Sequence, residues 1–142
     1  MAEGLFKTLI AKKSENKEIE VASAGICALE GEPASKNAII AAKDYDANLT
    51  EHRAKVLTKE MITSVEIVLT MTESHKHHII NKYPVAQDKV YNLMEYAYLD
   101  EANNLKKKLN VPDPYGLSIE AYNECAKEIF EALLKVYENI FD

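Results

Sequence analysis

The 142-residue sequence has no tryptophan, two cysteines, four glycines and four prolines. The two cysteines, Cys27 and Cys125, lie far apart and have no companion at the spacing of a zinc site or a redox pair, so neither a metal scaffold nor a disulfide framework is indicated. We expect each to be a small buried side chain. No apolar run approaches the roughly 18 residues that cross a bilayer, and the N-terminus lacks the pattern of a secretory signal. These absences favour a cytoplasmic protein without membrane contact.

Positive charge is also scarce, because 17 lysines and arginines face 23 aspartates and glutamates, for a formal charge of −6. Binding to nucleic acid or to an anionic membrane needs concentrated positive charge, so neither partner is expected. The one basic run, at 106–108, is flanked by asparagines and is typical of a solvated loop or helix end. An apolar content of 47% in a chain of this length suits one compact core, and we predict a single domain over residues 1–142.

Helical and strand patterns alternate along the chain. In chain order, we predict a helix at 1–13, a strand at 19–25, a helix at 36–45, a short helix beginning at 58–61, a strand at 66–71, a helix at 73–83, a strand at 89–93 and a last helix from 118 towards 142. Ser35, Thr58 and Ser118 stand where helix caps are expected. The apolar run at 66–71 is typical of a buried parallel strand. This order predicts an α/β fold with a parallel sheet flanked by helices.

One loop combines two prolines and a glycine around a single carboxylate, in the sequence Pro-Asp-Pro-Tyr-Gly at 112–116. Each proline fixes its own φ near −65° and favours an extended conformation in the residue before it, so Asp113 is expected on a stiff loop outside helices and strands. Two interpretations stay open on these residues alone. The loop is either an ordinary turn, since Asp and Pro are common turn residues, or a carboxylate aimed at a substrate.

Six short blocks, in order and spacing, resemble the low-molecular-weight protein tyrosine phosphatases over the whole chain. The blocks are MAEGLF at 1–6, SAG at 23–25, GEPA at 31–34, HRAK at 52–55, LTMT at 69–72 and PDPYG at 112–116. The resemblance implies a three-layer α/β fold, a parallel sheet of strand order 2-1-3-4, and a hydrolase that uses no metal or other cofactor.

The resemblance also implies roles for individual residues. Asp113 matches the general acid, which later activates water to hydrolyse a cysteinyl phosphate. Tyr115 matches an aromatic wall beside the substrate, and Leu29 stands where many members carry an aromatic specificity residue. Ser23 and His52 match residues that hydrogen-bond to the phosphate-binding loop and hold its shape. Without the resemblance, Ser23 would simply end a strand and His52 would cap a turn.

The resemblance exposes a gap at the start of the chain. In this family a first strand and a phosphate-binding loop of the form Cys-x5-Arg-Ser-Pro come immediately before the segment that resembles residues 1–3. We therefore expect this chain to lack the nucleophilic cysteine, the phosphate-binding arginine and the central first strand, and to be inactive as given. Cys27 has no arginine at the required spacing, and Cys125 lies on the apolar face of the last helix, so neither is predicted as a nucleophile.

The absent strand would be an interior one, flanked by the segments near Val21 and Val68. Losing about five buried apolar side chains at roughly 1.5–3 kcal/mol each forfeits on the order of 10 kcal/mol, comparable to the stability of a small domain. We expect the two flanking strands to pair directly, or a second chain to fill the gap, because unpaired strand edges favour self-association. We also expect the loop at 112–116 to be mobile.

The predicted function is hydrolysis of phosphotyrosine in proteins, or of small aryl phosphates, by the full-length form. Leu29 removes one stacking wall, which keeps phosphoarginine as an alternative substrate. Arsenate reduction ranks lower, because no closely spaced cysteines are present. A truncated, non-catalytic module that acts through self-association is the alternative from another class. His75, His77 and His78 could suggest a metal, but no carboxylate or cysteine completes a set nearby, and we interpret them as a solvated helix face.

Overall fold

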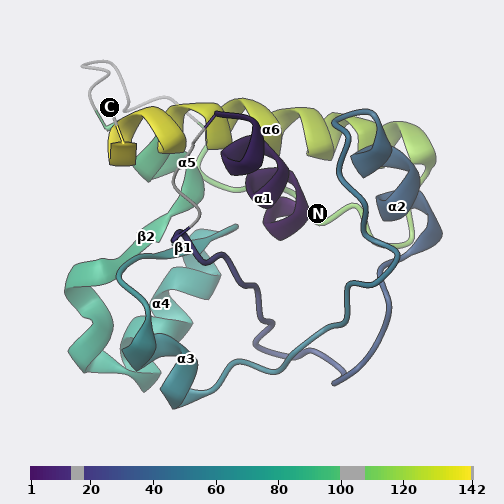
Figure 1. The fold of residues 1–142 in the computed structure, drawn as a ribbon. Helices are drawn as coiled ribbons and strands as arrows, with labels where there is room; N and C mark the ends of the chain where they lie inside the picture. Colours follow the sequence, from purple (N-terminus) through teal and green to yellow (C-terminus); the bar gives the residue numbers. More distant parts are fainter. Residues whose placement is uncertain (14–17, 100–107, 142) are drawn as a thin grey trace.

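The computed structural model describes residues 1–13, 18–99 and 108–141. It has an α/β architecture in which a parallel sheet lies between helices, which confirms the predicted fold class (Figure 1). The elements in chain order are α1 (Ala2–Lys13), α2 (Lys36–Lys43), α3 (Lys59–Ser64), β1 (Val68–Thr70), α4 (Glu73–Lys82), the 3-10 helix η1 (Pro84–Lys89), β2 (Val90–Asn92), α5 (Leu93–Ala97) and α6 (Ile119–Phe141).

Side-chain caps start most of the helices. Ser35 Oγ accepts the backbone N–H of Ala38 at 3.2 Å, and Ser118 Oγ accepts that of Ala121 at 3.4 Å. Thr58 caps α3 in the same way, so all three predicted caps are confirmed. The end of the last predicted helix, at residue 142, and most of the basic run at 106–108 fall outside the described residues.

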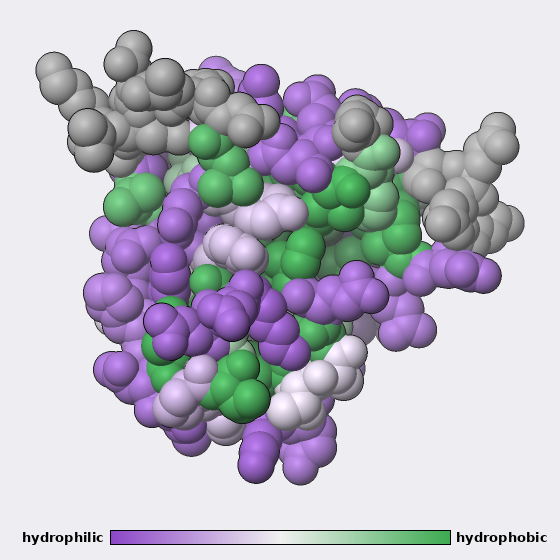
Figure 2. Space-filling model, turned by 90° about the vertical axis from the view of Figure 1, so that its left-hand side faces the viewer, coloured by the Kyte–Doolittle hydropathy of each residue, from purple (hydrophilic) through white to green (hydrophobic). Residues whose placement is uncertain are grey.

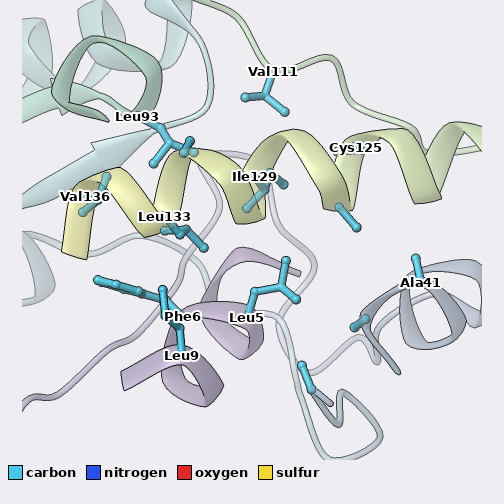
Figure 3. Close-up of a cluster of buried hydrophobic side chains, with 14 of the residues drawn as sticks. Leu5, Phe6, Leu9, Ala41, Leu93, Val111, Cys125, Ile129, Leu133 and Val136 are labelled. Carbon is cyan, nitrogen blue, oxygen red and sulfur yellow. The ribbon is translucent and has the colours of Figure 1, made fainter. Parts of the chain in front are cut away.

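The main core forms along α6, which crosses one side of the molecule with α1, α2 and α5 packed against it (Figure 1). In Figure 3, Leu5 and Phe6 of α1 lie against the face of α6 that carries Ile129 and Leu133. The apolar residues of this face recur every three or four positions in the sequence of α6, which is the pattern of a helix with one buried side. A second, smaller cluster joins α3, α4, η1 and β2; its buried members are Ile62, Ile79, Ala86 and Val90.

The sheet consists of β1 and β2, which run parallel with Val68 opposite Val90 and Thr70 opposite Asn92. The predicted strand at 66–71 is present, but only three of its residues pair, and Val68 and Leu69 are half-buried. The prediction of a parallel strand is therefore confirmed, but its expected burial holds only for Thr70. The physical reason is that β2 is the one strand that pairs with β1 within the described residues, so the other edge of β1 carries no neighbour.

The segment 19–25 is not a strand, in contrast to the prediction. Its backbone is linked to the rest of the chain at Gly25, whose N–H donates to the carbonyl of Lys55 at 2.9 Å and whose carbonyl accepts the N–H of Leu57 at 3.0 Å. The segment does not pair with β1 among the described residues, so the expected direct pairing of the two flanking strands does not occur. On the side of the molecule that carries the strands, apolar surface lies open among polar side chains (Figure 2).

In the described ranges, no helix combines the length and the apolar character that crossing a bilayer requires.

Candidate functional site

The loop that carries Asp113 is tied to the sheet at its start. Just past the end of β1, the carbonyl of Met71 accepts the N–H of Val111 at 2.9 Å, and Val111 is buried in the main core. Asp113 Oδ1 accepts the N–H of Tyr115 at 3.0 Å, which closes an Asx turn. The turn interpretation of this loop is therefore confirmed. The Asp113 side chain is exposed, and its aim at a substrate stays a prediction. The expected mobility stays a prediction, and these bonds oppose it.

Tyr115 and Leu29 are exposed on separate loops, with 80% and 70% of their surface accessible. Gly116 follows Tyr115 with φ at +77°, a conformation that favours glycine and turns the loop back towards α6. The loop of Leu29 is held by the carboxylate of Glu30, which accepts the N–H of Val56 at 2.7 Å. Both side chains are therefore exposed on loops whose backbones are held by hydrogen bonds, an arrangement that suits contact with a ligand.

Ser23 and His52 are brought together by a residue that the sequence reasoning missed, Glu3. Ser23 Oγ donates to Glu3 Oε2 at 2.5 Å, and His52 Nδ1 lies 3.7 Å from the same oxygen. The other oxygen, Oε1, accepts Lys7 Nζ at 2.5 Å. Partial burial alone would raise the pKa of Glu3, but hydrogen bonds from Lys7 and Ser23 outweigh it and lower the pKa below its ordinary value. The i,i+4 spacing of Glu3 and Lys7 was the available sequence signal.

A cavity of about 220 Å³ lies beside Asp113. Its lining consists of Lys108, Pro112, Asp113, Pro114, Leu117, Ala121, Glu124, Cys125 and Glu128. Cys125 is 7% exposed, as predicted, and its thiol donates to the carbonyl of Pro112 at 3.7 Å. Burial, followed by the charge of Glu128, raises the pKa of this thiol, so it stays protonated at neutral pH and is a poor nucleophile.

Cys27 is exposed, so the prediction of a buried side chain was wrong for this residue. The reason is that the loop after residue 25 runs over the surface instead of entering the core. A Cys-x5-Arg loop needs arginine six positions after the cysteine, and those positions hold Pro33 for Cys27 and Glu131 for Cys125.

The histidines of α4 lie on an exposed face of the helix, as predicted. His75, His77 and His78 are exposed, and His77 Nε2 lies 3.8 Å from the carboxylate of Glu73 one turn earlier. Across the described part of the chain, no group of three or more His, Cys, Asp or Glu side chains is arranged to hold a metal ion.

The chain is similar to known proteins along nearly its whole length. The family described as "Low molecular weight phosphotyrosine protein phosphatase" matches residues 1–141. The protein-arginine-phosphatase of Bacillus subtilis is 31% identical over 140 residues, which are 99% of this chain and 87% of that protein. A crystal structure of a YwlE mutant from Bacillus subtilis superposes with a TM-score of 0.86 at 30% identity, covering 99% of this chain and 88% of that one. A low molecular weight protein tyrosine phosphatase from T. tengcongensis gives 0.85 at 33% identity, covering 98% and 88%.

Proposed function

The chain belongs to the low molecular weight phosphotyrosine protein phosphatase family, and from this premise we propose that it is part of an enzyme that removes phosphate from the side chains of phosphorylated proteins. The observation that carries the proposal is the exposed carboxylate of Asp113, held by its Asx turn on a loop anchored to the end of β1. A carboxyl group held in this way can donate a proton to a leaving group and later take one from water.

The chemistry runs in two steps. A cysteine thiolate attacks phosphorus and the bond to the leaving oxygen or nitrogen breaks, while the Asp113 carboxyl protonates that leaving atom. The Asp113 carboxylate then removes a proton from a water molecule, which attacks the cysteinyl phosphate and releases inorganic phosphate and the thiolate. Ser23 and His52 act one layer further out, as hydrogen-bonding supports of the loop that holds the phosphate.

The nucleophile in this proposal is neither of the two cysteines of the chain. Cys125 is buried and has a raised pKa, and Cys27 lacks an arginine at the sixth following position. We propose that the cysteine and the phosphate-binding arginine belong to a longer form of the protein, and that the chain as given does not turn over an aryl phosphate. A first test is the DNA immediately upstream of the Met1 codon, where an in-frame Cys-x5-Arg-Ser-Pro supports the proposal and its absence contradicts it.

Two substrates are candidates. Phosphotyrosine is supported by the description of the family and by the exposed ring of Tyr115, which can stack on an aromatic substrate. Phosphoarginine is supported by Leu29, an exposed aliphatic side chain where many members of the family carry an aromatic residue, and by the similarity to a protein-arginine-phosphatase. We favour phosphoarginine because the loop of Leu29 offers no second ring.

The decisive assay compares the longer form on two peptides that differ only in the phosphorylated residue. We expect kcat/KM to be higher for phosphoarginine, and a higher value for phosphotyrosine would reverse the choice. Asp113→Asn should lower kcat on either peptide by about 100-fold or more, which is the usual contribution of a positioned general acid. Asp46→Asn, a surface carboxylate in an ion pair with Lys12, is the matched control and should leave kcat unchanged.

A non-catalytic module is the alternative from another class, and the free edge of β1 is the observation that favours it. Two three-residue strands make a small sheet, and an unpaired edge with apolar neighbours can add a strand from a second copy. Light scattering on the chain as given tests this alternative. A dimer whose mass falls when a proline replaces Leu69 would support it, and a monomer at high concentration would contradict it.

A further inference from the structure

Glu3 joins three segments that are far apart in the sequence. It lies in the first turn of α1 with 16% of its side chain exposed, while Ser23 belongs to the segment after α1 and His52 to the loop before α3. The side chains of Ser23 and His52 meet at the Glu3 carboxylate, whose two oxygens also serve Lys7.

The two carboxylate oxygens of Glu3 have different partners. Oε1 accepts Lys7 Nζ, which comes from the same helix and is more than half exposed. Oε2 accepts Ser23 Oγ at 2.5 Å and faces His52 Nδ1 at 3.7 Å, and both of these residues come from outside the helix. The bond to Lys7 therefore occupies only Oε1, and Oε2 is left to hold the two other segments.

The segment that carries Ser23 has little else to place it. It forms no strand within the described residues, and its regular backbone bonds begin at Gly25. The loop that carries His52 is braced by Arg53, whose guanidinium donates to the carbonyls of Thr50 and His52. Arg53 already holds the loop of His52 in place. Glu3 contacts both His52 and Ser23, so it also holds Ser23 in a defined position relative to that loop.

We infer that Glu3 is a positioning residue that sets the places of the Ser23 hydroxyl and the His52 ring at the start of α1. The inference rests on the proposed function, in which the Ser23 hydroxyl and the His52 ring support a phosphate-binding loop. Glu3 contacts no substrate in this scheme and acts only through Ser23 and His52.

A simpler interpretation is that Glu3 and Lys7 form an ordinary surface ion pair that supports α1, since pairs at i,i+4 stabilise helices. The two interpretations differ in what Lys7 does. In the simpler one, removing Lys7 or Glu3 has the same effect, which is confined to α1. In ours, removing Glu3 alters Ser23 and His52, and removing Lys7 leaves both nearly in place.

The test is solution NMR on the chain as given, which requires no catalytic activity. Glu3→Ala should abolish the nuclear Overhauser effects from Ser23 and from the His52 ring to α1. Glu3→Gln keeps an acceptor for Ser23 and loses the charge that attracts His52, so it should restore the Ser23 contacts alone. Lys7→Met is the matched control and should retain both sets.

A pH titration of the wild type adds a second measurement, the resonances of Ser23. These should not follow the protonation of Glu3 if Glu3 only supports α1. The groups that interact with the Glu3 carboxylate are Lys7 on α1, Ser23, His52 and the α-amino group of Met1, so the resonances of Ser23 should follow protonation of Glu3 in the acid range below the ordinary pKa of a glutamate. In Glu3→Gln this acid transition should disappear. Because the pKa of Glu3 is lowered by folding, the contacts are complete above that range and are lost below it.

Either of two results overturns the inference. One is that Ser23 and His52 keep their contacts in Glu3→Ala. The other is that Lys7→Met disturbs them as much as Glu3→Ala does, and if Glu3→Ala does not fold, the titration and the Glu3→Gln variant decide. The outcome is separate from the proposed function: a longer form without phosphatase activity defeats the function while the contacts stand, and an active enzyme with unchanged contacts defeats only the role of Glu3.

Discussion

The two sides of the molecule differ in how completely the chain buries its own apolar residues. Along α6, Ala126 and Val136 have no exposed surface, and neither has Leu5 of α1 opposite them. In β1, Val68 and Leu69 are half-buried although they belong to an equally apolar run. Sequence hydrophobicity alone therefore does not decide burial.

The difference follows from what each element needs in order to be covered. A helix satisfies its backbone hydrogen bonds within itself, so α6 needs only neighbours for one apolar stripe, and α1, α2 and α5 provide them. A strand needs a partner on each edge and a layer on each face. β1 has one partner, β2, within the described residues, and its two apolar side chains stay partly in contact with solvent.

The largest expected effect is the difference in the free energy of unfolding between Leu5→Ala and Leu69→Ala. Leu5 is fully buried between α1 and α6, so its truncation leaves a cavity and should lower the free energy of unfolding by about 3–4 kcal/mol. Leu69 is half-buried, and its loss should be about 1 kcal/mol. Urea denaturation measures both. Equal losses would mean that β1 is as well covered in solution as α6.

The reactivities of the two thiols provide a second comparison between a surface loop and the buried face of α6. Cys27 is exposed on a surface loop, and Cys125 is a buried residue of α6 whose thiol has a raised pKa. A thiol reagent at neutral pH should label Cys27 first and Cys125 at least about 100-fold more slowly, because labelling of Cys125 requires local opening. Mass spectrometry of digests after timed labelling gives both rates. Rates within tenfold of each other would show that the α6 side opens as easily as the surface loop.

Gly4→Ala tests how tightly α1 is packed on the loop before His52. A Cβ at Gly4 would lie 2.3 Å from Cδ2 of Leu49, which is itself buried. We expect a loss of about 1–2 kcal/mol, as is usual for one added methyl group in a full core. Thermal unfolding of Gly4→Ala in a Leu49→Ala background is the control, where the added cost should nearly vanish. An unchanged cost there would mean that Leu49 is not the obstacle.

The smallest effect concerns the cap of α2, a local interaction at the start of a helix that packs against α6. Ser35→Ala removes the acceptor for the N–H of Ala38 at the start of α2 and should cost about 1 kcal/mol. Ser35→Asp, which can still cap, should retain most of the stability in urea denaturation. A similar loss in both variants would point to the packing of residue 35 and not to its cap.

Features that depend on neighbours in sequence were predictable, and features that depend on distant contacts were not. The caps at Ser35, Thr58 and Ser118 and the buried face of α6 follow from local spacing, and the structure has them. The strand expected at 19–25 failed because alternation of residues cannot specify a partner strand. In the candidate site, the turn around Asp113 follows from its prolines. The meeting of Ser23 and His52 at Glu3 joins residues up to 49 positions apart (52 − 3), and the local i,i+4 pair of Glu3 and Lys7 does not reveal it.

The hydrogen bond from the N–H of Val111 to the carbonyl of Met71 makes β1 a mechanical support for Asp113 two residues later. If movement of the strand end moves the carboxylate, then the Asp113 loop and the edge of β1 that has no partner within the described residues are coupled sites. Thermodynamic linkage makes such a connection reciprocal: a strand that docks on the edge and fixes Asp113 would itself bind more tightly once a ligand holds Asp113 in the same place.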